Sequence, residues 1–122
     1  MNEDTFWKIL DDIFCFGEFV VAVPNIAVSA NIVGSISIGK DGNERVIDKD
    51  ACHCHVHLKP EKIAYFFFTF VDAGFGEEPC IELKTPQDKT VLRLYLRGDR
   101  EKAMMEFAEF PSANSEFVKG SW

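Results

Sequence analysis

The stretch of the sequence best suited to chemistry is 51–57, which reads Ala-Cys-His-Cys-His-Val-His. It holds all three histidines of the chain, His53, His55 and His57, and two of the four cysteines. In a β-strand alternate side chains point to opposite faces, so the histidines would share one face. Neighbouring histidines would lie roughly 6.6 Å apart along the strand. The pattern predicts at most a two-ligand metal site between two neighbouring histidines, such as His55 and His57, or one axial ligand for a flat cofactor such as haem.

The same alternation also has a purely structural interpretation. Cysteine is among the most buried residue types, so Cys52 and Cys54 could face a core while the histidines face solvent. A closed zinc site needs four ligands, and the sequence shows no second ligand pair at a suitable spacing. Both interpretations stay open on the residues alone.

Composition indicates one domain, 1–122, with a modest core. The formal net charge of −7 argues against nucleic acid as a partner and against anionic membrane surfaces, since both attract basic patches. No apolar run is long enough for membrane insertion. The acidic start Met1-Asn2-Glu3-Asp4 is unlike a signal peptide, and four cysteines in such a chain are typical of reduced thiols. We therefore expect a cytoplasmic protein.

The hydrophobic pattern predicts a helix at each end of a series of strands. The first helix spans Asp4 to Cys15, with Asp4 or Thr5 as its cap and Gly17 closing its end. The second spans 100–109, with Asp99 as its cap, and 111–122 follows as a C-terminal tail. The segments expected to be extended are 18–23, 26–33, 35–39, 45–47, the histidine stretch, 63–71, 80–85 and 90–97, with a turn at 40–43.

Two of these strands carry further predictions. The segment 63–71 is apolar on both faces, which predicts burial on both sides. Symmetric pairing about the turn at 86–89 places Glu82 opposite Arg93 and Leu83 opposite Leu92. The face that carries Arg93, Tyr95 and Arg97 could hold a carboxylate, or could simply be solvated.

Several features follow one another in a particular order along the chain. Phe16-Gly17 ends the first helix, and His55-Val56-His57 precedes the apolar strand. The strand Val91 to Leu96 leads through Arg97-Gly98-Asp99-Arg100 into the second helix. This order resembles the haem-utilisation carrier family of the ChuX/HutX type. The resemblance implies an α+β fold of HemS/ChuX type, with antiparallel β-sheet layers, an N-terminal helix and a C-terminal helix after the last hairpin.

The resemblance also implies an intracellular homodimer that holds haem and passes it on. Haem suits an apolar, Phe-rich wall, its iron takes His or Tyr as a ligand, and its propionates pair with Arg or Lys. Histidines and a tyrosine are the candidate ligands of the iron, and arginines are the candidate partners of the propionates. The residues expected to bind haem are His53, His55, His57, Tyr65, Arg93 and Arg97.

Two functions are consistent with these observations. The first is a non-catalytic haem carrier or buffer in haem and iron utilisation, with a haem donor or acceptor protein as a partner. The alternative is a small dimeric interaction module without haem, in which the His/Cys strand is structural or an incidental metal site. Catalysis ranks lower because the sequence has no nucleophile-elbow motif. A dyad between Cys80 and one of the histidines stays open.

Overall fold

The computed structural model describes residues 1–24, 30–34, 36–42, 44–49, 55–72, 74, 76–97, 100–114 and 116–122. Its helical elements are α1 (Glu3–Phe14), η1 (Pro60–Lys62) and α2 (Arg100–Ala113). Its strands are β1 (Glu18–Val23), β2 (Ala30–Gly34), β3 (Ile36–Asp41), β4 (Glu44–Lys49), β5 (His55–Val56), β6 (Tyr65–Asp72), β7 (Glu77–Lys84), β8 (Thr90–Arg97) and β9 (Val118–Gly120).

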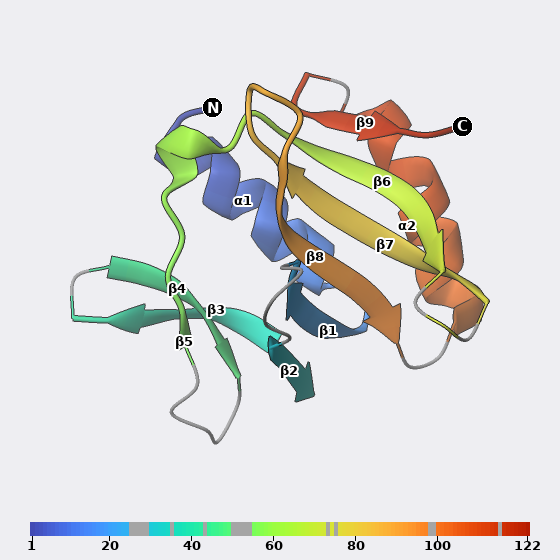
Figure 1. Cartoon of the computed structure of the whole chain (residues 1–122), viewed down its shortest axis with the longest axis horizontal. Helices are drawn as coiled ribbons and strands as arrows, with labels where there is room; N and C mark the ends of the chain where they lie inside the picture. Colours follow the sequence, from blue (N-terminus) through green and yellow to red (C-terminus); the bar gives the residue numbers. More distant parts are fainter. Residues whose placement is uncertain are drawn as a thin grey trace.

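The strands form two sheets (Figure 1). The larger sheet has six strands in the order β2-β1-β8-β7-β6-β9, and the smaller has three in the order β3-β4-β5. Neighbouring strands are antiparallel except β6 and β9, which run parallel. An N-terminal helix, two mostly antiparallel sheets and a C-terminal helix confirm the predicted α+β class.

The hairpin of β7 and β8 has the predicted register. Glu82 pairs with Arg93, and Leu83 pairs with Leu92. Leu94 and its neighbours on the same face of β8 are fully buried. A slip of one residue would move these leucines to the other face, so the core fixes the register.

Both helices pack on one face of the six-stranded sheet (Figure 1). Phe6 of α1 stacks on Phe66 of β6, with 5.4 Å between ring centroids. Phe107 of α2 lies 5.0 Å from Phe68 on the same strand. Aromatic rings from both helices therefore meet on β6 and form the centre of the core.

The prediction that the Phe-rich strand is buried on both faces is wrong. Phe66 and Phe68 are fully buried, but Tyr65 and Phe67 on the opposite face are partly exposed. The helices cover only one face of the sheet, so Tyr65 and Phe67 on the other face remain in contact with solvent. We call this second face the open face of the six-stranded sheet.

The caps of α1 also differ from the prediction. The Asn2 side chain, not Asp4 or Thr5, is the cap, and it accepts a hydrogen bond of 2.8 Å from the Thr5 N–H. Asp4 lies instead in the first turn, where its negative charge interacts favourably with the positive end of the helix dipole. The helix ends on Cys15 in a right-handed conformation, so its end does not require the conformational freedom of Gly17.

The expectation that 111–122 forms a tail is also wrong. The helix α2 continues through Pro111 and ends at Ala113, and the chain then adds β9 beside β6. Val118 of β9 is buried in the main core, and this burial stabilises the segment against the sheet. Asp99, the predicted cap of α2, lies outside the described residues.

The three-stranded sheet packs one face against α1. Ile36 of β3 and Ile47 of β4 belong to the core that contains α1. Arg45 of β4 forms an ion pair with Asp4 of α1, with 2.9 Å between Nη2 and Oδ1. The side chains that alternate with these residues point to the opposite face, where the histidines lie.

Candidate functional site

The two histidines that the structure describes lie side by side at β5. The ring centroids of His55 and His57 are 6.4 Å apart, in keeping with the predicted placement on one face. His53, Cys52 and Cys54 lie outside the described residues. The predicted pair His55 and His57 is thus brought together in space.

Three carboxylates surround this pair. Asp41 Oδ2 lies 3.1 Å from His57 Nε2 and 3.9 Å from His55 Nδ1. Glu44 Oε2 lies 3.3 Å from His57 Nδ1, and Asp48 Oδ1 lies 3.5 Å from His55 Nε2. Each imidazole therefore stands between Asp41 and a second carboxylate of its own. We call these five residues the His/Asp cluster.

The β3–β4 hairpin brings the acidic residues to the histidines. Asp41 ends β3 and Glu44 begins β4, and Gly42 between them has a left-handed φ of +64° that suits a tight turn. Asp48 pairs directly with His55 across the β4–β5 ladder. The turn was predicted from the sequence, but these three acids were not among the expected site residues. Glu44 and Asp48 lie on one face of β4, and this signal required the strand order.

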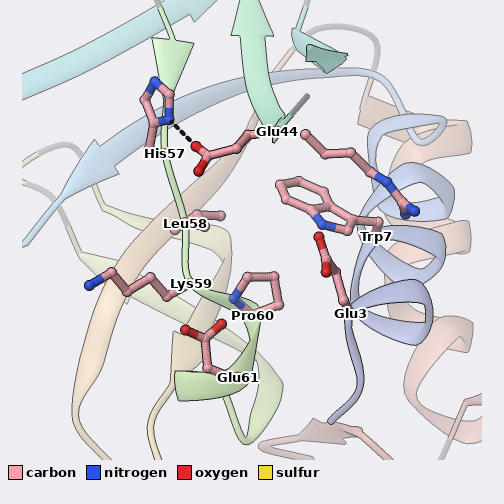
Figure 2. A pocket seen from close by; sticks show the side chains of 9 residues that line it. Glu3, Trp7, Glu44, His57, Leu58, Lys59, Pro60 and Glu61 are labelled. Atoms are coloured by element: carbon pink, nitrogen blue, oxygen red, sulfur yellow. Dashed lines mark hydrogen bonds and ion pairs between the residues drawn. The ribbon is translucent and has the colours of Figure 1, made fainter. Parts of the chain in front are cut away.

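A cavity of about 360 Å³ opens next to His57 (Figure 2). The indole of Trp7, from α1, lines one wall, and its Nε1–H is buried without a hydrogen-bond partner. Figure 2 shows His57 at the rim, where it meets Glu44. The other lining residues are Glu3, Arg45, Leu58, Lys59, Pro60 and Glu61.

A second cavity, of about 310 Å³, also includes His57 in its lining. Its walls are mainly aliphatic, and two lysines, Lys59 and Lys62, complete them. The aliphatic lining residues are Val23, Val56, Leu58, Ile63, Val91 and Leu92. We call this the aliphatic cavity. Its volume is at the lower end of the roughly 300–1,000 Å³ typical of ligand pockets.

Tyr65 lies apart from the histidines, on the six-stranded sheet. Its hydroxyl donates a hydrogen bond to Asp88 Oδ1. This bond, with smaller contributions from burial and nearby negative charge, raises the pKa of Tyr65 to about 12. A tyrosine binds iron as the phenolate, so this environment disfavours Tyr65 as a ligand.

Arg93 and Arg97 lie on the open face of the six-stranded sheet and are already paired. Arg93 Nε donates to Glu82 Oε2 at 2.9 Å, and Arg97 Nη1 lies 3.0 Å from Glu78 Oε2. Both glutamates are buried, so each needs its cationic partner. Lys59 and Lys62, by contrast, line the aliphatic cavity together with His57.

Cys80 is fully buried in β7. Burial, followed by the negative charge of Glu82, raises the pKa of the Cys80 thiol to about 12. A thiol must ionise to act as a nucleophile, so Cys80 is chemically quiet near neutral pH. This argues against a catalytic dyad between Cys80 and a histidine.

Comparison with known proteins identifies the architecture. No family model matches the sequence, and a search of curated proteins found no match. The heme-binding protein ChuX, however, superposes with a TM-score of 0.70 over 93% of this chain and 74% of its own, at 14% identity. The chain has the ChuX fold. A protein from Agrobacterium tumefaciens shares it at a TM-score of 0.66 and 14% identity, covering 90% of this chain and 67% of its own.

A protein from Erwinia carotovora also has the ChuX fold, with a TM-score of 0.64 and 11% identity over 93% of this chain and 72% of its own. The resemblance indicated by the sequence is therefore confirmed at the level of the fold. At this identity the ligand has to be inferred from the residues of this chain. Within the described residues, no helix is long and apolar enough to cross a membrane.

Proposed function

We propose that this protein is a cytoplasmic haem-binding carrier or buffer without catalytic activity of its own. The observation that carries the proposal is the position of His57 in the wall of the aliphatic cavity, within a fold shared with a heme-binding protein. His57 would be the iron ligand, the aliphatic walls would contact the macrocycle, and Lys59 and Lys62 would pair with the propionates.

The chemistry of the cavity fits this cargo. Haem is mostly apolar with two acidic groups, and the cavity is mostly aliphatic with two lysines. His57 is about half exposed, so a haem bound there would stay open to a donor or acceptor protein. Exchange with such a partner is what a carrier requires, and Cys15 and Cys80 are free thiols, as is typical of the cytoplasm.

A second arrangement would place haem on the open face of the six-stranded sheet, with Tyr65 on the iron and Arg93 and Arg97 on the propionates. We rank it lower because Glu82 and Glu78 already occupy the two guanidinium groups. The partly exposed Phe67 on that face is a better candidate for contact with a second copy in a homodimer.

A haem titration followed by Soret absorbance tests the proposal. We expect saturable one-to-one binding by the wild type, loss of binding in His57→Ala and retention in Tyr65→Phe. His55→Ala is the matched control, because His55 lines neither cavity. Binding retained in His57→Ala would refute the site, and no saturable binding by the wild type would favour an interaction module instead.

The propionate contacts are tested separately. An exposed ion pair contributes up to about 1 kcal/mol, so we expect Lys59→Gln with Lys62→Gln to weaken haem binding about tenfold. The control is Lys8→Gln with Lys102→Gln, two exposed helix lysines. Equal losses in both double variants would show that overall charge, not this cavity, attracts haem.

A further inference from the structure

We infer that Asp41, His55 and His57 bind one divalent first-row transition-metal ion on the face of the three-stranded sheet that points away from α1. This site does not depend on the proposed haem function, although it shares His57 with it. The ion would be held by one carboxylate oxygen and two imidazole nitrogens, and its remaining positions would be open to water.

The distances between the three ligand groups suit a metal ion. One nitrogen from each histidine and one oxygen of Asp41 lie within 4.8 Å of one another. Two ligands bound to zinc in tetrahedral geometry are about 3.4 Å apart, given metal–ligand bonds of about 2.1 Å. The distances of 3.1 and 3.9 Å from Asp41 Oδ2 to the two rings lie on either side of this value.

The second nitrogen of each ring also has the partner that a metal-bound histidine needs. A ligating imidazole usually donates its other N–H to a carboxylate, which fixes the ring and its tautomer. Here His57 Nδ1 meets Glu44, and His55 Nε2 faces Asp48. Each ring thus has Asp41 at one nitrogen and a separate carboxylate at the other. With a metal ion beside Asp41, both histidines would show the carboxylate–histidine–metal arrangement.

The backbone makes room for this arrangement. A Cβ added to Gly39 would lie 2.7 Å from Asp48 Oδ2, so only glycine allows the Asp48 carboxylate to lie over β3. Asp48 Oδ1 is buried and lacks a hydrogen-bond partner. A metal ion on the other nitrogen of His55 would fix the Nε2–H toward this oxygen and satisfy it.

The charges of the cluster point to a cation. Three carboxylates meet two imidazoles, which gives a net charge of −3 when the rings are neutral, and a divalent ion would reduce it to −1. Two nitrogen ligands favour Zn²⁺, Fe²⁺ or their neighbours over Mg²⁺ or Ca²⁺, which prefer oxygen. The metal-free alternative is a network of contacts between the imidazoles and the carboxylates, and it predicts no specific metal affinity.

A Zn²⁺ titration of the metal-free full-length chain, against a chromogenic chelator, tests the site. The thiols of Cys52 and Cys54 are removed as competing ligands by Cys52→Ser with Cys54→Ser. In this background we expect one Zn²⁺ per chain. Asp41→Asn should weaken binding by more than about 100-fold, since even the loss of an outer partner costs about 10- to 100-fold. Asp11→Asn is the matched control on an exposed helix position and should leave binding unchanged.

His55→Ala gives an independent check, because it removes a ligand without touching either cavity. We expect the same loss of Zn²⁺ as in Asp41→Asn, and the loss of the visible bands of bound Co²⁺, while haem binding stays intact. No one-to-one Zn²⁺ binding, or Zn²⁺ affinity unchanged in both Asp41→Asn and His55→Ala, would overturn the metal site. Haem binding in His57→Ala tests only the haem proposal, whereas the metal site is tested by Zn²⁺ binding in Asp41→Asn and His55→Ala.

Discussion

At the scale of single residues, Cys80 shows how burial lowers the reactivity of a thiol. Its thiol pKa is about 12, whereas Cys15 lies exposed at the end of α1. In the Cys52→Ser, Cys54→Ser variant we expect a thiol reagent to modify Cys15 rapidly and Cys80 only after unfolding. Two fast-reacting thiols in the native variant would contradict the burial of Cys80.

Tyr65 predicts a dependence of stability on alkaline pH. Its pKa rises from 10.0 to about 12 on folding, mainly because its hydroxyl donates to Asp88. The folded state therefore holds this proton more tightly than the unfolded state. The stabilisation is fully present below pH 10 and is lost as the pH rises toward about 12. We expect Tyr65→Phe to be less stable than wild type at about pH 8, with a difference that shrinks above pH 10.

Urea unfolding of both proteins across this pH range measures the effect. Asp88→Asn is a useful companion variant, because it keeps an acceptor but removes the charge next to the hydroxyl. A stability difference between Tyr65→Phe and wild type that does not change with pH would contradict the role of this hydrogen bond.

Residue patterns alone predicted part of the His/Asp cluster. Alternation on one strand placed His55 and His57 together, because strand geometry is local. Asp41 is separated from the histidines by the whole of β4, so its approach depends on the order of three strands and on the turn at Gly42. Sequence spacing does not contain that order, and Asp41 was therefore missed.

At the scale of elements, β6 provides a test of the two faces of the sheet. Phe66 is buried and stacked on Phe6, so Phe66→Ala should lower the free energy of unfolding by about 3–5 kcal/mol. Phe67 is partly exposed on the open face, so Phe67→Ala should cost less than half as much. Urea unfolding compares the two variants. Equal losses would contradict an open face, and a dependence on protein concentration would then identify a second copy as its cover.

Gly39 tests the outer partner of the metal site. Because a Cβ there would collide with Asp48, we expect Gly39→Ala to turn that carboxylate away from His55. Zn²⁺ affinity should fall about 10- to 100-fold, as for the loss of other outer partners. Ser37→Ala, on the same strand and paired with Asp48, is the control and should bind Zn²⁺ normally. Unchanged affinity in Gly39→Ala would show that Asp48 does not support the site.

The element predictions succeeded where local pattern and packing agree. The β7–β8 register followed from apolar and charged pairs such as Leu83 with Leu92 and Glu82 with Arg93. The end of α2 was not predicted, because a proline such as Pro111 usually ends a helix. Here the segment packs against the sheet, and the helix continues through Pro111. The predicted double burial of β6 failed for a related reason, since apolar composition does not specify how many layers cover a strand.

At the scale of the whole molecule, His57 lies where the two sheets meet. The chain leaves β5 at this residue and enters the six-stranded sheet through η1, while α1 contacts both sheets through Phe6 and the Asp4–Arg45 ion pair. His57 lines the aliphatic cavity and also meets Asp41 in the His/Asp cluster. One imidazole is therefore available to either of two ligands.

The two proposals together predict that Zn²⁺ and haem exclude each other. If both need His57, Zn²⁺ at about 100 times its dissociation constant should weaken haem binding about 100-fold, because competition follows mass action. By linkage, haem should weaken Zn²⁺ binding by the same mechanism. Haem titrations with and without Zn²⁺, in the Cys52→Ser, Cys54→Ser background, measure the factor. Asp41→Asn should abolish most of the effect, since it removes Zn²⁺ but keeps His57. Haem affinity that is unaffected by bound Zn²⁺ would show that the two ligands do not share His57.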